Sequence, residues 1–101
     1  MTMKLVELRD SDKKISAIIL GTWAIGGSHW GPYDEANAVK AIEAALDKGI
    51  NAIDTAPVYG DGHAEELIGR AIRGKRDGIF LATKCGLDIY DRSYRRDLSP
   101  A

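Results

Sequence analysis

The chain has 101 residues, of which 45% are hydrophobic, and this suits one small globular domain. Its 14 basic and 15 acidic residues leave a net charge of -1, which argues against a nucleic-acid-binding surface. No apolar run reaches the roughly 18 residues of a membrane span, and the first residues lack a signal peptide's apolar stretch. We therefore expect a soluble, cytoplasmic protein. Cys85 is the only cysteine, which excludes an internal disulfide, and the sequence has no metal-ligand grouping.

The first elements expected along the chain are a hairpin, a strand and a long loop. Residues 4–8 and 13–16 predict the two strands of a surface hairpin joined by a polar turn. The apolar run 17–20, ended by Gly21, predicts a strand buried on both faces of a parallel sheet. The glycine-rich segment 21–33 predicts a long irregular loop, and such loops are often functional.

A helix and a second strand are expected next. Asp34 is a suitable N-cap, and the apolar residues that follow recur at helical spacing up to a stop signal at residues 48–49. Residues 50–54 then predict a second buried strand. The carboxylate of Asp54 would stand at the carboxyl end of this strand.

The rest of the chain predicts a second helix and a third strand. Apolar residues at helical spacing mark a helix around residues 67–72, where Gly69 is a candidate point of close packing. Residues 79–83 predict the third buried strand, which ends at Lys84, and a Ser-Pro pair at 99–100 predicts the start of another helix. Helix-length connections between buried strands imply a parallel α/β arrangement. Such a sheet would leave one edge unpaired and one face incompletely covered, so we expect the N-terminal part of a larger fold.

Asp54, Tyr59 and Lys84 each follow a predicted strand, and together they can make a proton donor. A tyrosine hydroxyl has a reference pKa of ~10, so its use as an acid near pH 7 requires stabilisation of the phenolate. A lysine ammonium supplies this stabilisation, and a carboxylate keeps the ammonium charged and oriented. Taken singly, Asp54 could cap a turn, Tyr59 could cover the core and Lys84 could be solvated. Their joint placement at strand ends favours the catalytic interpretation.

Several blocks of the sequence, in order and spacing, resemble the aldo-keto reductase family. They are Leu-Gly-Thr-Trp-Ala-Ile-Gly-Gly at 20–27, Ile-Asp-Thr-Ala at 53–56, Val-Tyr-Gly at 58–60, Glu-Glu-Leu-Ile-Gly at 65–69 and Ala-Thr-Lys at 82–84. The resemblance covers nearly the whole chain. It implies that residues 1–101 are the N-terminal portion of a single (β/α)8 TIM barrel, with the hairpin, the first three strands and two helices. Active sites of such barrels lie at the carboxyl ends of the strands.

The resemblance also implies a reaction and its participants. Tyr59 would protonate the oxygen of an aldehyde or ketone, assisted by Lys84 and Asp54, while NADPH supplies a hydride; NADH is not excluded. The substrate-orienting histidine that the family places after the fourth strand, and its cofactor-phosphate loops, are absent from the 101 residues. The alternative is therefore a catalytically silent piece with a structural or interaction role. The remaining part of the barrel is a candidate partner.

Further candidates for the site lie in the first loop. By the resemblance, Gly21, Thr22, Trp23 and Asp54 would contact the cofactor, and Trp23 would line the substrate pocket. Packing at the rim is an equal alternative for Trp23. Trp30 lies farther along the same loop and is a candidate for the substrate pocket, but anchoring of the loop is the preferred interpretation for it. From the residue type alone, Gly21 predicts a tight turn or a close backbone approach.

Cys85 is expected to be a buried, inert thiol. It follows Lys84 and should point to the opposite side of a continuing strand. Neither a histidine nor a helix start stands beside it in the sequence to favour a thiolate.

Overall fold

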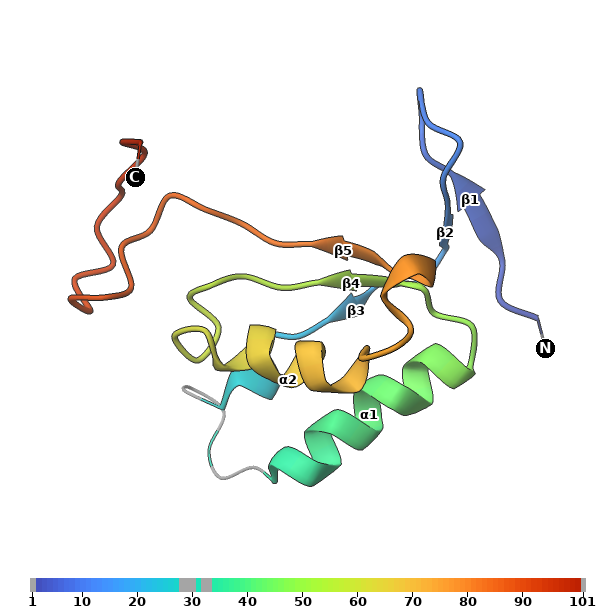
Figure 1. Cartoon of the computed structure of the whole chain (residues 1–101), viewed down its shortest axis with the longest axis horizontal. Coiled ribbons are helices and arrows are strands. Elements are labelled where there is room, and N and C mark those ends of the chain that lie inside the picture. The colour runs from blue at the N-terminus through green and yellow to red at the C-terminus, as the bar shows by residue number, and fades with distance from the viewer. Residues whose placement is uncertain (1, 28–30, 32–33, 101) are drawn as a thin grey trace.

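The computed structural model describes residues 2–27, 31 and 34–100 and shows an α/β arrangement with an N-terminal hairpin. Its elements are β1 (Leu5–Glu7), β2 (Lys14–Ser16), β3 (Leu20–Gly21), the 3-10 helix η1 (Ala24–Gly26), α1 (Glu35–Asp47), β4 (Ala52–Asp54), α2 (His63–Ala71), the 3-10 helix η2 (Arg76–Gly78) and β5 (Phe80–Ala82). Helices α1 and α2 lie on one face of the sheet β3-β4-β5, with the hairpin near one end and the segment after β5 extending from the other (Figure 1). The α/β class and the hairpin are confirmed; the described strands do not close into a barrel.

The three-stranded sheet is parallel and has β4 at its centre. Ile53 of β4 stands opposite Leu20 on one side and Leu81 on the other. In the same register, Asp54 stands opposite Gly21 and Ala82. Because all three strands run the same way, the residues that follow them meet at one edge of the sheet.

Both predicted helices form, and their apolar residues pack in a core with Ile53 of β4 and Ile79. The side chain of Asp34 accepts hydrogen bonds from the N–H groups of Ala36 (2.8 Å) and Asn37 (3.4 Å), which confirms it as the N-cap of α1. The buried core cluster comprises Ile42, Ile53, Ile68, Ala71, Ile72 and Ile79.

In the part of the chain that the structure describes, neither helix is long and apolar enough to cross a membrane. The cytoplasmic location stays a prediction.

Hydrogen bonds of Asn51 connect the hairpin to the amino end of β4. The Asn51 Oδ1 atom accepts a hydrogen bond from the Ser16 N–H at 2.7 Å, and the Ser16 hydroxyl accepts one from the Asn51 N–H at 3.1 Å. The Asn51 side-chain amide also donates to the carbonyl of Lys14 at 3.1 Å. Asn51, a polar residue within the predicted second strand, therefore joins the two sheets.

The first strand of the parallel sheet is shorter than predicted, since β3 contains only Leu20 and Gly21. Ile18 and Ile19 are 58% and 50% exposed, so the prediction of a strand at 17–20 buried on both faces is wrong. Two hydrogen bonds explain the difference. The Ala17 N–H donates to the carbonyl of Lys4, and the Ser16 hydroxyl donates to the carbonyl of Ile18, so the chain bends away from the hairpin before it joins the sheet.

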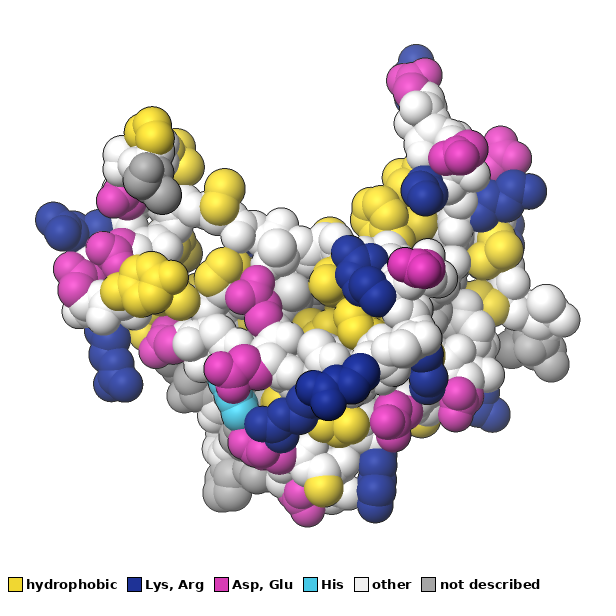
Figure 2. All heavy atoms as spheres, viewed as in Figure 1, with side chains coloured by type: hydrophobic (Ala, Val, Ile, Leu, Met, Phe, Trp, Pro, Cys, Tyr) yellow, Lys and Arg dark blue, Asp and Glu magenta, His cyan; other side chains and the backbone are white. Residues whose placement is uncertain are grey.

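The face of the sheet opposite the helices is open in this chain. Phe80 of β5 is 39% exposed, so the predicted third strand is not fully buried, in agreement with the expectation that one face of the sheet is incompletely covered. Figure 2 shows hydrophobic side chains in the hollow between the hairpin and the segment that follows β5. The helices cover one face of the sheet, and no described residue covers these side chains from the other.

Two other segments differ from the sequence prediction. The loop predicted at 21–33 contains a 3-10 helix at Ala24–Gly26, whereas residues 28–30 and 32–33 lie outside the described residues. Residues 98–100 are not helical. The Ser99 N–H and hydroxyl both donate to the Asp97 carboxylate, at 3.0 and 2.5 Å, which forms a local turn in place of the predicted helix start.

Gly69 does not provide a close approach between helices. It is exposed within α2, and a Cβ atom added there would meet nothing within 4 Å, so the packing prediction is wrong. Glycine in a helix interior is less stable than alanine by roughly 0.5–1 kcal/mol. We therefore expect Gly69→Ala to raise the free energy of unfolding by about that amount in urea denaturation. An unchanged or lowered value would contradict this expectation.

Candidate active site

The structure brings Asp54, Tyr59 and Lys84 together around one ammonium group. Asp54 ends β4, Tyr59 lies in the following turn, and Lys84 stands two residues after β5. The Lys84 Nζ atom donates to Asp54 Oδ1 at 2.8 Å, to the carbonyl of Thr55 at 2.7 Å and to the Tyr59 hydroxyl at 3.4 Å. The contact between these three side chains agrees with the prediction from strand ends. The Thr55 carbonyl is an additional partner that sequence patterns could not reveal, because every residue type has one.

The surroundings of Lys84 keep it charged. The hydrogen bond to Asp54 raises the pKa of Lys84 above its ordinary value, the hydrogen bond to Tyr59 acts in the same direction, and partial desolvation opposes them. The Nζ atom also lies 5.1 Å from the centroid of the Tyr59 ring. A positive charge is therefore held beside the tyrosine hydroxyl throughout the neutral pH range.

The raised pKa of Lys84 predicts a pH dependence of stability. A folded-state pKa above the unfolded value means that the contribution of charged Lys84 is complete below the ordinary value of 10.5 and is lost as pH rises through the folded-state pKa. We expect the difference in unfolding free energy between wild type and Lys84→Met to stay constant from neutral pH to about pH 10 and then shrink. The Lys84 and Asp54 side chains are 49% and 48% exposed, so this difference should be small, about 1 kcal/mol or less. Urea unfolding across pH tests this, and a difference that already fades near neutral pH would contradict it.

The backbone of the turn after β4 fixes Tyr59. Its N–H donates to the carbonyl of Ala56 at 3.1 Å, and its own carbonyl accepts from the N–H of Ala64, in the first turn of α2, at 3.2 Å. Gly60 follows with a left-handed φ of +65°, and its Cα has no room for a side chain against the backbone of Gly26. The turn carrying Tyr59 is therefore held between η1 and α2.

Thr22 is fully buried and supports Asp54. Its hydroxyl donates to the backbone carbonyl of Asp54 at 2.9 Å. Thr55, the residue after Asp54, is also buried, but the Thr55 Oγ1 atom has no hydrogen-bond partner among the described residues. The predicted cofactor residue Thr22 is therefore buried, and its hydroxyl is already hydrogen-bonded to the backbone of Asp54.

The two buried threonines make a matched pair for stability measurements. Thr22→Val removes a buried hydrogen bond, and we expect it to lower the free energy of unfolding by about 1–2 kcal/mol. Thr55→Val removes an unpaired hydroxyl from a site of the same shape, so we expect no loss and a gain of up to about 1 kcal/mol. Urea denaturation of both variants checks the pair. Equal losses in the two variants would show that the hydrogen bond of Thr22 does not add to the free energy of unfolding.

Gly21 and Trp23 leave accessible surface beside the site. A Cβ atom on Gly21 would meet nothing within 4 Å, so the residue makes no close approach to other protein atoms, and its φ lies outside the left-handed range. The expectation of a tight turn at Gly21 is therefore wrong. Trp23 is 53% exposed and stacks on Tyr59 with ring centroids 6.1 Å apart and an interplanar angle of 22°. A flat aromatic surface thus adjoins the tyrosine hydroxyl.

The remaining predicted residues are placed differently. Trp30 lies outside the described residues. Cys85 is exposed, which corrects the prediction of a buried thiol: β5 ends at Ala82, so the strand does not continue to Cys85. A pocket of about 120 Å³ adjoins Lys84 and is lined by Ala56, Pro57, Val58, Lys84, Cys85 and Leu87.

Comparison with known proteins identifies close sequence relatives. The sequence model of the Aldo/keto reductase family matches residues 17–101. Aldo-keto reductase YhdN of Bacillus subtilis strain 168 is 52% identical over 88 residues, which cover 85% of this chain and 27% of that protein. The NADH-specific methylglyoxal reductase of Escherichia coli K12 is 37% identical over 111 residues, which cover 97% of this chain and 34% of that protein. The chain thus spans about a quarter to a third of the length of these relatives.

Solved structures give the same result. The holo form of aldo-keto reductase AKR11C1 from Bacillus halodurans superposes with a TM-score of 0.78 at 32% identity, over 93% of this chain and 30% of that one. An aldo-keto reductase from Klebsiella pneumoniae in complex with NADPH superposes with a TM-score of 0.69 at 35% identity, over 93% and 33% of the two chains. Sequence and fold agree over most of residues 1–101, and the chain belongs to the aldo/keto reductase family.

Proposed function

We propose that this chain carries the proton-donating part of an NADPH-dependent oxidoreductase that reduces aldehydes or ketones to alcohols. The observation that carries the proposal is the position of the Lys84 Nζ atom, 2.8 Å from Asp54 Oδ1 and 3.4 Å from the Tyr59 hydroxyl. Membership of the aldo/keto reductase family supports it.

Tyr59 acts as the general acid in this proposal. As the carbonyl carbon is reduced, the electrons of its π bond move onto oxygen, and the Tyr59 hydroxyl gives its proton to that oxygen. The phenolate left behind is stabilised by the Lys84 ammonium, whose Nζ atom already contacts the phenol oxygen. Asp54 contributes by holding and orienting the ammonium.

The surface around these residues fits a nicotinamide cofactor. Gly21 offers open space beside Asp54, and the exposed ring of Trp23 offers a flat surface for an aromatic ring. When bound, NADPH supplies the hydride that reduces the carbonyl carbon. The Klebsiella pneumoniae relative in complex with NADPH supports this choice, and the NADH-specific relative from Escherichia coli makes NADH the second candidate. Thr22 would act indirectly, by holding the backbone of Asp54, because its own hydroxyl is buried and hydrogen-bonded there.

The substrate is proposed to be a small carbonyl compound that reaches Tyr59 past Trp23. The pocket beside Lys84 is largely apolar in its lining, which suits an alkyl group next to the carbonyl. Trp30 is proposed as a further substrate-pocket residue, on its position in the first loop. The name of the Escherichia coli methylglyoxal reductase is consistent with a small carbonyl substrate.

The described elements are proposed to be the N-terminal portion of a (β/α)8 barrel. Strands β3 and β5 are the edges of the sheet, the sheet is uncovered on one face, and the relatives are about three times longer. Further strands would have to pair with these edges. They would come from residues beyond 101 or from a separate chain that acts as a partner.

The test is an NADPH oxidation assay on the full-length protein and, separately, on the 101-residue chain. We expect aldehyde-dependent loss of NADPH absorbance with the former and none with the latter, because a barrel needs its remaining strands. A full-length protein that is folded but consumes neither NADPH nor NADH with a panel of aldehydes and ketones would refute the proposed activity. Turnover by the 101-residue chain alone would refute the proposal that the chain is only part of the catalytic unit.

A further inference from the structure

The structure assigns a role to Glu65, which lies in the first turn of α2. We propose that Glu65 is a positioning residue that sets Lys84 against Tyr59 through a hydrogen bond with Thr83. This inference rests on the proposed function, because it concerns how the proton donor is assembled. It adds a residue that contacts neither Asp54 nor the phenol and would act through the chain segment that carries Lys84.

The first step of the argument is the contact itself. The Thr83 hydroxyl donates to Glu65 Oε1 at 2.6 Å, a length typical of a strong hydrogen bond to a carboxylate. Thr83 lies directly between Ala82, the last residue of β5, and Lys84. Successive side chains of an extended chain point to opposite sides, so Glu65 holds Thr83 from the helix side and Lys84 projects to the other. Fixing Thr83 therefore fixes the base of the Lys84 side chain.

The second step is that the same helical turn also holds Tyr59. Ala64, the residue before Glu65, is fully buried and donates its N–H to the carbonyl of Tyr59 at 3.2 Å. Two consecutive residues of α2 thus hold the two segments whose side chains must meet. The helix behind them is anchored in the core by Leu67 and Ile68, which are 0% and 1% exposed. Helix α2 therefore sets the spacing between the segments that carry Tyr59 and Lys84.

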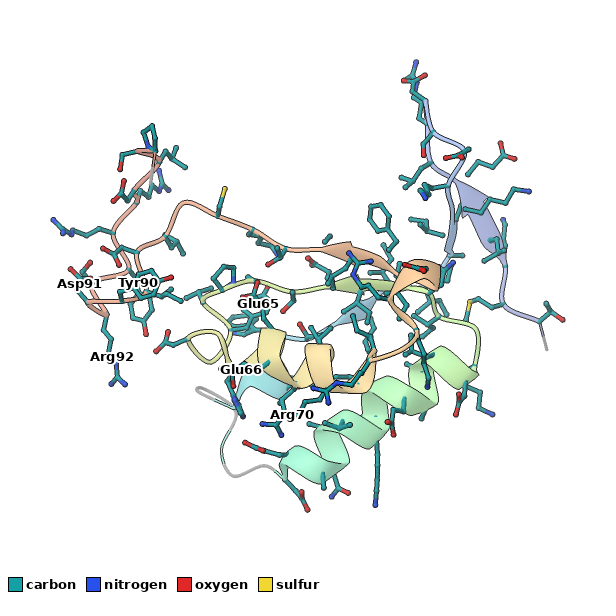
Figure 3. All side chains as sticks on the ribbon, in the orientation of Figure 1. Glu65, Glu66, Arg70, Tyr90, Asp91 and Arg92 are labelled. Atoms are coloured by element: carbon teal, nitrogen blue, oxygen red, sulfur yellow. The ribbon has the colours of Figure 1, made fainter. Side chains whose placement is uncertain are left out.

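The third step is the contrast with the next residue. Glu66 has the same carboxylate but points elsewhere: its side chain is 70% exposed and lies 3.5 Å from His63, on the side of α2 that faces α1. Figure 3 shows Glu65 toward the strand ends, while Glu66 and Arg70 lie on the side toward the start of α1. Both glutamates occupy the first turn of α2 and contribute alike to the helix dipole. Glu66 is therefore a matched control for charge without the contact to Thr83.

The experiment measures the pH dependence of kcat and kcat/KM for the full-length enzyme and its variants. We expect Glu65→Ala and Thr83→Val each to lower kcat about tenfold, because a reacting group displaced by a fraction of an ångström loses much of its efficiency. KM should change less than about twofold, since neither residue lines the proposed substrate pocket. A weaker link between Lys84 and the phenol should also move the alkaline limb of kcat/KM to higher pH by up to about one unit.

Conservative variants separate positioning from general destabilisation. Glu65→Gln and Thr83→Ser keep an acceptor and a donor for the same hydrogen bond, so they should retain most of the wild-type kcat and its pH profile. The double variant Glu65→Ala with Thr83→Val should be no worse than either single variant, because both remove one interaction. Glu66→Gln should match wild type in kcat and pH profile. If Glu65→Ala does not fold, Thr83→Val and Thr83→Ser test the same bond from the strand side.

The outcomes distinguish this inference from the proposed function. A Glu65→Ala enzyme with an unchanged pH profile, or a double variant in which the two losses of activity add independently, overturns the positioning role. Near-normal carbonyl reduction by Tyr59→Phe overturns the proposed function itself, whatever Glu65 does. Inactive Tyr59→Phe together with normal Glu65→Ala and Thr83→Val overturns the positioning role alone.

Discussion

Tyr59→Phe is expected to lower kcat for carbonyl reduction by roughly a hundredfold to ten-thousandfold, the usual contribution of a general acid. The substitution removes the hydroxyl that contacts Lys84 Nζ and leaves the ring that stacks on Trp23. Binding of NADPH should therefore stay within about twofold of wild type, because the surfaces offered by Gly21 and Trp23 persist. Steady-state kinetics of the full-length enzyme and fluorescence titration with NADPH measure the two quantities.

Tyr90→Phe supplies the matched control. It makes the same chemical change at a tyrosine that is 95% exposed in the segment after β5. We expect its kcat to stay within about twofold of wild type. A Tyr59→Phe enzyme that retains most of its turnover would contradict the assignment of Tyr59 as the acid, whereas equal losses in both variants would point to a general effect of removing a phenol.

The contact between Asp54, Tyr59 and Lys84 was predictable from the sequence because the parallel topology brings the strand ends together. Asp54 and Lys84 stand at the ends of adjacent parallel strands, and such ends meet at one edge of a sheet in any parallel arrangement. The hydrogen bond between Thr83 and Glu65 was not predictable. It depends on the rotation of α2 relative to the sheet, and the sequence of the helix carries two adjacent glutamates that only the packing tells apart.

The errors in the predicted fold have two causes: polar contacts that hydrophobic patterns do not show, and a face of the sheet that no described residue covers. Residues 17–19 are apolar and fit a strand pattern, but the hydrogen bonds of Ala17 to Lys4 and of Ser16 to Ile18 hold Ala17 against the hairpin and bend the chain before it joins the sheet. Phe80 belongs to a correctly predicted strand, yet it is exposed because no described residue covers that face of the sheet. Patterns of hydrophobicity indicate which side chains can be buried; they do not state what buries them.

Gly60→Ala is expected to be the most destabilising substitution in the turn that carries Tyr59. A Cβ atom on Gly60 would collide with the carbonyl oxygen of Gly26 and lie 2.9 Å from the carbonyl carbon and Cα of that residue. These are backbone atoms of η1, so no side-chain rotation can relieve the contact. The φ of +65° adds the strain that a non-glycine residue meets in the left-handed region. We expect a loss of roughly 3 kcal/mol or more in the free energy of unfolding.

Gly62→Ala separates the collision from the backbone strain. Gly62 is two residues away and also has a positive φ, of 95°, but a Cβ atom there would meet nothing within 4 Å. Its loss should therefore be about 1–2 kcal/mol, the cost of conformation alone. Gly26→Ala approaches the same contact from the other side, with Tyr59 backbone carbon 2.6 Å from the added Cβ, and should resemble Gly60→Ala. If Gly60→Ala and Gly62→Ala lost equal stability in urea denaturation, the close approach of η1 to the Tyr59 turn would carry no weight. If Gly60→Ala also lost activity while Gly62→Ala kept it, the contact between Gly60 and Gly26 would be shown to hold Tyr59 in place.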